Sequence, residues 1–388
     1  MLQKVKVLDF SRVLSGPYCS RMLADLGAEV IKVESKSGEF IRKAFPHKGE
    51  YSSYFTQFNL GKQGLSLDLR KQEGVDLIKK LVSKCDVVLE NFRPGRMAEM
   101  GLGYDILSEI NPQIIFCSIS GFGQTGEESK RPAYTDIIQA FSGLDYAAGE
   151  MFGGTGAPPG FPFSLGDTYA SLNAAIAILT ALYHRQSTGE GQYIDISMLD
   201  CIMAANDSTI QKHIFTDGKD DIPNFIFRPP FKMKDGYMAA SVALNFEKTV
   251  QAIGRPELLE DESFRKPANL REFFDVYIQI VGEWAATQTV AEASAIFDEY
   301  DIPYGKVQTT DEIVNSPVVE RRNMLVDIDL PDVGKVPVVN TPFKFSKQKT
   351  GPQGPPPKVG EHTDKTLKAW LNLTDKEIEE LRQREIVF

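Results

Sequence analysis

Short apolar segments alternate with helix-like segments through the first half of the chain. The apolar runs lie at residues 5–10, 29–34, 64–69, 86–92 and 114–122, and stretches with helical spacing separate them. Parallel strands need a long crossover connection, which is usually a helix, so this alternation is typical of repeated βαβ units. The pattern predicts an α/β fold built on a mostly parallel sheet.

The sequence changes character after residue 205. Residues 206–225 are largely polar and include Pro223, which is typical of a linker. A hairpin-like strand pattern and several helical segments then follow over residues 226–325, and they predict a smaller α+β domain. Residues 326–388 begin with a further strand-like stretch, continue through a segment rich in proline and glycine, and end in a helix.

Composition narrows the classes of partner. A formal net charge of −10 argues against nucleic acid or an anionic membrane as the main partner. No apolar run reaches the length of a membrane span, and the first residues lead directly into a strand, so we expect neither a membrane segment nor a signal peptide.

Cysteine and histidine usage narrows the chemistry. The four cysteines have no C-x-x-C spacing, which favours reduced thiols in a cytoplasmic protein. The four histidines do not pair at metal-ligand spacing. We therefore expect no metal site, and a Ser-His-Asp arrangement has little support.

Asp167 is the acidic residue with most chemical interest. It follows a short polar stop and precedes a long alanine-rich helical pattern that runs to about His184. We therefore expect the acid where a helix begins, where unpaired N–H groups and the helix dipole favour a negative charge. Two interpretations stay open from position alone: Asp167 is a helix N-cap, or it is an anionic nucleophile.

Several arginines are candidates for binding an anionic ligand. Arg93 and Arg96 flank a Pro-Gly turn directly after the strand at 86–92, and Arg42 and Arg70 follow other strands. Open α/β sheets bind ligands at the carboxyl ends of their strands, and arginine suits phosphate groups. The alternative is that they are solvated surface charges. The chain has no dinucleotide fingerprint and no Walker A motif.

Tyr134 lies just before a helix expected near Asp136. Its ring is expected to pack at the edge of the core, and its hydroxyl could instead orient a ligand.

Together these segments resemble the class III coenzyme A transferases, the family of formyl-CoA and carnitine CoA-transferases, which is related to the 2-methylacyl-CoA racemases. The likeness covers nearly the whole chain and keeps the order of the motifs. The segments that carry it are LDFSRVLSGPYCSRMLADLGAEVIKVE, ENFRPG, GLGYDILSEINPQIIFCSISGFGQTG, QAFSGL, LGDTYAS and GEHTD.

The resemblance implies a domain layout and an assembly. It implies a Rossmann-like large domain that is built from both chain ends, residues 1–205 and 326–388, with residues 206–225 as linker and 226–325 as the smaller α+β domain. It also implies an obligate homodimer whose two subunits interlock.

The resemblance also implies the site. It makes Asp167 the nucleophile, and it places Tyr134 near the active site. Arg42 and Arg70 are implied as phosphate partners. The other positions expected to bind CoA are Val13, Leu67, Asn91, Phe92, Arg93, Arg96 and Met100.

This chain departs from the family pattern at two charged positions. Glu99 stands where many relatives have arginine, and Ser35 stands where some relatives have arginine. Because Arg96 is three residues before Glu99 and would share its helix face, we expect Arg96 to supply the missing positive charge.

The implied function is transfer of CoA from an acyl-CoA thioester to a free carboxylic acid through a covalent aspartyl intermediate at Asp167. CoA is then a substrate, and no tightly bound cofactor is expected. One alternative is a 2-methylacyl-CoA racemase, although Tyr134 stands where the racemase histidine would lie. A second alternative is a CoA-ester-binding protein without activity.

Overall fold

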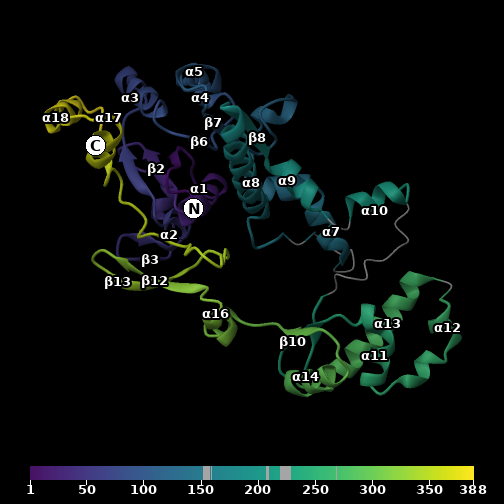
Figure 1. Cartoon of the computed structure of the whole chain (residues 1–388). Helices are drawn as coiled ribbons and strands as arrows, with labels where there is room; N and C mark the ends of the chain where they lie inside the picture. Colours follow the sequence, from purple (N-terminus) through teal and green to yellow (C-terminus); the bar gives the residue numbers. More distant parts are fainter. Residues whose placement is uncertain (152–157, 159, 207–208, 219–228, 268) are drawn as a thin grey trace. The chain divides into compact units, whose positions relative to one another are not determined.

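The computed structural model describes two compact units. The larger comprises Met1–Ser142, Gly160–Ala205 and Pro317–Phe388, and the smaller comprises Gly143–Pro159 and Asn206–Ser316 (Figure 1). The residues described are 1–388 except 152–157, 159, 207–208, 219–228 and 268.

A six-stranded sheet, parallel throughout, forms the centre of the larger unit. Its strand order is β5-β2-β1-β6-β7-β8, so the chain winds outward from β1 to one edge and then returns to build the other half. The mixed α/β fold with a parallel sheet is therefore confirmed. The bounds are β1 Lys6–Asp9, β2 Glu29–Glu34, β5 Gln63–Ser66, β6 Val87–Glu90, β7 Ile115–Ser120 and β8 Gln192–Ser197.

Helices cover both faces of this sheet. Helices α1 (Ser15–Asp25) and α8 (Leu165–Thr188) pack against each other, with α1 on β1, β2 and β6 and α8 on β7 and β8. The opposite face packs with α3 (Gln72–Val82), α5 (Tyr104–Ile110) and the C-terminal helices α17 (Thr363–Leu371) and α18 (Asp375–Gln383). Because both faces are covered, the central strands β2, β1, β6 and β7 are buried along nearly their whole length.

The remaining elements of the larger unit are short or lie at its edges. Two antiparallel pairs, β3 with β4 and β12 with β13, stand apart from the main sheet. Their bounds, with those of the other helices, are β3 His47–Lys48, β4 Tyr51–Ser52, β12 Leu325–Leu330, β13 Gly334–Val339, α2 Ser53–Asn59, α4 Arg96–Glu99, α6 Thr135–Phe141, α9 Met198–Ala205 and α16 Pro317–Arg321.

Helix boundaries differ from the sequence prediction in two places. The helical stretch expected between the apolar runs at 86–92 and 114–122 is divided into α4 and α5, because Gly101 adopts φ +71 and ends the first helix. Helix α8 begins at Leu165 with Ser164 as its N-cap residue, so Asp167 is the third residue of the helix. The N-cap interpretation of Asp167 is therefore wrong.

Within the described residues, α8 is the one helix long and apolar enough to cross a membrane by length and composition. In the structure 44% of its most apolar 18-residue window is buried, and it contacts α1, α6, α9, β7 and β8. Helix α8 therefore packs one face against the rest of the larger unit and leaves the other face exposed.

The smaller unit has a three-stranded antiparallel sheet, β11-β10-β9, with its own core. The hairpin expected at 232–242 corresponds to β9 and β10. Fully buried Tyr277 lies in that core, and its hydroxyl donates to the carbonyl of Val242 at 2.9 Å. The bounds are β9 Phe231–Lys232, β10 Tyr237–Ala240, β11 Tyr304–Lys306, α7 Leu144–Met151, α10 Ile210–Phe215, α11 Phe246–Ala252, α12 Glu262–Arg265, α13 Leu270–Ala286, α14 Val290–Glu299 and α15 Thr310–Val314.

Candidate active site

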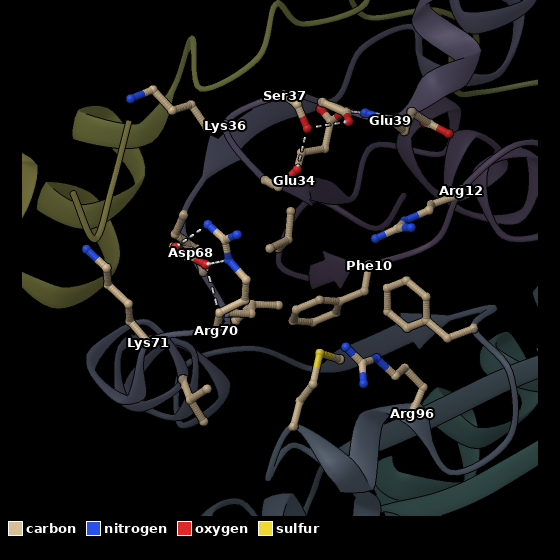
Figure 2. A pocket seen from close by; sticks show the side chains of 18 of the residues that line it. Phe10, Arg12, Glu34, Lys36, Ser37, Glu39, Asp68, Arg70, Lys71 and Arg96 are labelled. Carbon is tan, nitrogen blue, oxygen red and sulfur yellow. Dashed lines mark hydrogen bonds and ion pairs between the residues drawn. The ribbon is translucent and has the colours of Figure 1, made fainter.

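A large pocket lies at the carboxyl ends of β5, β2, β1 and β6 in the larger unit (Figure 2). It has a volume of ≈ 1090 Å³. The strand order reverses between β1 and β6, and open α/β sheets bind their ligands at such a switch point. The pocket therefore lies where the fold alone would place a ligand.

Most of the predicted CoA-binding residues line this pocket, and four do not. The lining residues from the predicted set are Leu67, Arg70, Phe92, Arg93, Arg96 and Met100. Those outside the lining are Val13, Arg42, Asn91 and Tyr134.

The cations of the pocket differ in how strongly they are already paired. Arg70 binds both carboxylate oxygens of Asp68 at 2.8 Å, and Arg96 pairs with Glu99 at 2.9 Å. Arg96 was expected to supply the positive charge that relatives have at position 99. In the structure, its guanidinium is already paired with Glu99 itself. Among the described lining residues, Arg12 and Arg93 are the guanidinium groups without a carboxylate partner. Figure 2 shows Arg70 turned onto Asp68.

Arg12 is a pocket residue that the sequence reasoning did not select. Its guanidinium lies 4.8 Å from the ring centroid of Phe92, a cation–π contact that joins the loop after β1 to the turn after β6. Its side chain is exposed and lacks an ion pair, so its charge is available to an anionic ligand.

Arg42 has a structural environment instead. Its guanidinium pairs with Glu34, donates to the carbonyl of Pro357 at 2.9 Å and lies 3.8 Å from the ring centroid of Phe55. Burial would raise the pKa of Glu34, but hydrogen bonding from Arg42 and the charge of Lys32 outweigh it and lower that pKa. Arg42 thus neutralises a buried acid.

The carboxylate of Asp167 faces the N-terminus of a different helix from its own. Ser15, the first residue of α1, interacts with it through both hydroxyl and backbone N–H. The hydroxyl oxygen of Ser171 lies 2.7 Å from the carbonyl oxygens of both Ser15 and Asp167, so its single proton is shared between an acceptor on α1 and one on α8. Burial raises the pKa of Asp167 to about 6, against the opposing effect of Ser15. With that pKa, roughly nine-tenths of the group is ionised at pH 7.

Asn91 acts on the protein backbone. Its side-chain amide accepts from the N–H of Arg12 and donates to the carbonyl of Arg12, each at 2.8 Å. It also donates to the hydroxyl of Ser15 at 3.0 Å. Asn91 therefore fixes the loop between β1 and α1.

Three residues near Asp167 were not predicted from the sequence: Tyr54, Thr135 and Gln139. Thr135 accepts from the backbone N–H of Asp167 at 3.4 Å, and Gln139 accepts from that of Leu165 at 2.9 Å. Both lie on α6, one helical turn apart, and no motif distinguishes them from ordinary helix residues.

Tyr54 lies on α2 beside Ser164 and Asp167. Burial, together with the charge of Asp167, raises the pKa of its phenol to about 12, although a hydrogen bond with Ser164 opposes the shift. Tyr54 is therefore a neutral hydrogen-bonding group next to the carboxylate. Tyr134, by contrast, is 70% exposed at the start of α6.

A mixed α/β fold with a parallel sheet and a large pocket at its switch point defines the class of open-sheet α/β proteins that bind ligands at the carboxyl ends of their strands. The CoA-transferase family III model matches residues 2–363, and this chain belongs to that family. It is accordingly a class III CoA-transferase.

Curated relatives match along nearly their whole length. The chain is 33% identical to the succinyl-CoA:glutarate CoA-transferase of Homo sapiens, covering 100% of this chain and 90% of that protein. It is 31% identical to the succinyl-CoA–D-citramalate CoA-transferase of Chloroflexus aurantiacus, covering 100% and 98%. It is 33% identical to the succinyl-CoA:mesaconate CoA-transferase of Haloarcula hispanica, covering 94% and 95%.

Solved structures agree with this assignment. A CAIB/BAIF family protein from Brucella suis superimposes with a TM-score of 0.80 at 30% identity, covering 95% of this chain and 99% of that one. The D175A mutant of Rv3272 from Mycobacterium tuberculosis gives a TM-score of 0.83 at 27% identity, covering 95% and 98%.

Proposed function

We propose that this chain transfers CoA from an acyl-CoA thioester to a free carboxylic acid through a covalent intermediate on Asp167. The observation that carries the proposal is the half-buried carboxylate of Asp167 facing the N-terminal N–H of α1 and the hydroxyl of Ser15. A helix N-terminus and a hydroxyl favour the ionised, attacking form of the acid.

The reaction needs no proton transfer. A carboxylate oxygen of Asp167 attacks the thioester carbonyl, the C–S bond breaks, and CoA leaves as thiolate from a mixed anhydride. The thiolate then attacks the aspartyl carbonyl of that anhydride, which releases the donor acid as its carboxylate and leaves an aspartyl-CoA thioester. The acceptor carboxylate attacks this thioester and expels the thiolate. The returning thiolate attacks the acceptor carbonyl, forms the new CoA ester and frees Asp167.

This chemistry agrees with the groups around Asp167. A reaction between carboxylates and thioesters runs without a general base, because its nucleophiles are already anions. The described interactions of Asp167 involve Ser15, Thr135, Ser171 and the neutral phenol of Tyr54. None of these is a base that could remove an α-proton at neutral pH, so racemisation has less support.

The relatives suggest the substrate class. Those cited above are named for succinyl-CoA as donor and for glutarate, D-citramalate or mesaconate as acceptor, each of which is a dicarboxylate. We therefore propose succinyl-CoA as donor and a short dicarboxylic acid as acceptor. A screen of C4 to C6 dicarboxylates with succinyl-CoA, read by mass spectrometry of the new CoA esters, tests this choice.

The CoA moiety is proposed to occupy the pocket at the switch point, with Arg12 as a phosphate partner. Arg12→Gln is expected to raise the KM for a CoA ester about tenfold while leaving that for the matching pantetheine thioester within about twofold, since pantetheine lacks the nucleotide phosphates. Equal effects on both thioesters would contradict a phosphate contact.

Trapping tests the covalent step. Hydroxylamine added during turnover is expected to leave a hydroxamate on Asp167, located by peptide mass spectrometry. Asp167→Asn should remove both the adduct and the transfer activity. Asp136→Asn is the matched control, because Asp136 is a first-turn acid of the neighbouring helix α6 and is exposed. A hydroxamate that persists in Asp167→Asn would exclude Asp167 as the nucleophile. The absence of any adduct in the wild type would leave a CoA-ester-binding protein as the better description.

The interlocked homodimer is also a proposal, and the surface of α8 supports it. Leu172, Ile176 and Tyr183 project from this otherwise packed helix with exposed fractions of 37%, 63% and 78%. Their spacing of four and seven residues places them on one helical face, which a second copy of the chain would cover. Light scattering should give a dimer for the wild type and a smaller species for Ile176→Asp; a monomeric wild type would overturn the proposal.

A further inference from the structure

The loop between β1 and α1 contains a β-branched residue in the left-handed backbone region. Val13 has φ +66, a conformation that non-glycine residues avoid and that β-branched residues adopt least readily. Its backbone N–H donates to Oε2 of Glu39 at 2.8 Å. Such strained residues persist only when their surroundings determine them strongly, and they are concentrated at functional sites.

Glu39 is held in place from the opposite side. It is 6% exposed, and its Oε1 lies 2.8 Å from Nζ of fully buried Lys32. The same ammonium donates to the carbonyl of Ser11 at 2.9 Å. The Lys32–Glu39 pair therefore holds the loop through two hydrogen bonds: Lys32 donates to the Ser11 carbonyl, and Glu39 accepts from the Val13 N–H. A buried ion pair is weak evidence for stability, so its geometry suggests a different role.

The loop held by this pair leads directly to Ser15, the residue that faces the proposed nucleophile Asp167. Two residues after Val13, Ser15 presents its N–H and hydroxyl to Asp167. Arg12, on the other side of Val13, lines the pocket. The backbone turn at Val13 thus sets the direction of α1 and the position of the pocket wall together.

We propose that Glu39 is a positioning residue that, by holding Val13 in the left-handed conformation, aims the N-terminus of α1 at the carboxylate of Asp167. The inference rests on the proposed function, because it concerns orientation of that nucleophile. Other charged or titratable groups that face Glu39 are Lys32, Lys62, Glu34 and Tyr54, and Tyr54 also faces Asp167.

A double-mutant cycle between Glu39 and Val13 tests the proposal. Glu39→Gln places an amide where both Lys32 and the Val13 N–H require an acceptor, so it weakens one contact or the other. We expect kcat to fall at least tenfold with the KM for the CoA ester changed less than threefold. In a Val13→Gly background the same substitution should lower kcat less than threefold, because glycine adopts positive φ without support. Equal losses in both backgrounds would overturn the proposal.

Two further variants separate positioning from folding. Glu39→Asp keeps the charge opposite Lys32, but its shorter side chain withdraws the acceptor from the Val13 N–H. If Glu39→Gln does not fold, Glu39→Asp should show the same fall in kcat. Val13→Gly should again reduce that fall. Asp25→Asn is the matched control, since Asp25 belongs to a buried pair with Arg21 at the far end of α1. It should lower thermal stability equally in both Val13 backgrounds and leave kcat unchanged in each.

An activity-free measurement distinguishes failure of this inference from failure of the proposed function. The difference in the pH dependence of thermal stability between wild type and Asp167→Asn reports the pKa of Asp167 in the folded state. Glu39→Asp should raise that pKa, because Ser15 would no longer stabilise the anion. An unchanged pKa would refute the positioning role, whether or not the protein transfers CoA.

Discussion

The side-chain amide of Asn91 donates to the hydroxyl of Ser15 at 3.0 Å, and Ser15 in turn faces the carboxylate of Asp167. Asn91 follows β6, Ser15 begins α1 and Asp167 lies in α8, so one short chain of contacts joins three segments distant in sequence. A residue assigned to CoA contact on sequence grounds therefore makes its described bonds to the loop that orients the nucleophile.

Asn91→Ala is expected to lower kcat at least tenfold and to reduce stability by about 1–2 kcal/mol, because it removes two bonds to Arg12 and one to Ser15. Asn111→Ala is the matched control. Its side-chain amide likewise makes three bonds: it donates to the carbonyls of Val82 and Cys85 at 3.0 and 2.9 Å and accepts from the N–H of Gln113 at 3.1 Å, at the opposite end of the strands from the pocket. It should cost similar stability with kcat unchanged. Denaturant unfolding and steady-state kinetics provide both numbers, and identical kcat losses would remove the special role of Asn91.

The pH profile of transfer should have an acid limb near pH 6. Burial raises the pKa of Asp167 to about 6 from its ordinary value of 3.8, and only the ionised form attacks. Activity is therefore expected to fall about tenfold per pH unit below that pKa. Measuring kcat/KM between pH 5 and 8 checks the limb; a flat profile across this window would contradict a carboxylate nucleophile with the raised pKa.

Glu90→Gln should stabilise the fold at alkaline but not at acidic pH. Burial raises the pKa of Glu90 to about 7, although Ser118 and the Phe92 N–H oppose the shift. The folded state then holds a proton that the unfolded state has released between about pH 4.5 and 7, so stability falls as pH rises through this window and stays reduced above it. The gain at pH 8 is expected to be at most about 3 kcal/mol and to vanish near pH 4. Thermal melts at both pH values test this, with exposed Glu109→Gln as a control that shows no such difference.

Arg42→Met should destabilise the protein without weakening CoA binding. Arg42 does not itself line the pocket; it pairs with the buried Glu34 and lies over the ring of Phe55, so its loss removes the ion-pair partner of that acid. The melting temperature is expected to drop by several degrees while the Kd for CoA, measured by calorimetry, stays within about twofold. A large rise in Kd with an unchanged melting temperature would restore Arg42 as a phosphate partner.

The sheet was predictable because its strands are short, largely apolar runs that are separated by helical stretches. The segments expected at 29–34 and 114–122 correspond to β2 and β7, and the Asp167 helix was recognised from its long periodic pattern. Its start was misplaced by two residues, because Gly166 and Leu165 look like part of the polar stop although they already have helical backbone. The start of this helix is also fixed by a tertiary hydrogen bond, from the Leu165 N–H to the side chain of Gln139 on α6, which periodicity does not reveal.

The partners of charged side chains were the least predictable feature. Arg42 and Arg96 have the composition expected of phosphate ligands, but Glu34 and Glu99 already pair with them. Lys32 and Glu39 are ordinary surface residue types in the sequence, and burial emerges only when β2 and the following loop pack against the loop after β1. Contacts between residues far apart in the chain determine which charged side chains are paired and buried, and the local sequence pattern does not predict these contacts.

The reversal of strand order between β1 and β6 has a consequence for how the protein responds to its ligand. The pocket at this switch point is lined by Phe10, which follows β1, and by Phe92, which follows β6. A ligand in the pocket therefore bridges two segments that are adjacent in the sheet but distant in the chain. Ligand that binds only the folded chain adds RT ln(1 + [L]/Kd) to the free energy of unfolding, about 2.7 kcal/mol at a hundredfold excess over Kd. The melting temperature of the protein therefore rises with occupancy of the pocket, and it ranks candidate CoA esters by affinity before any turnover is measured.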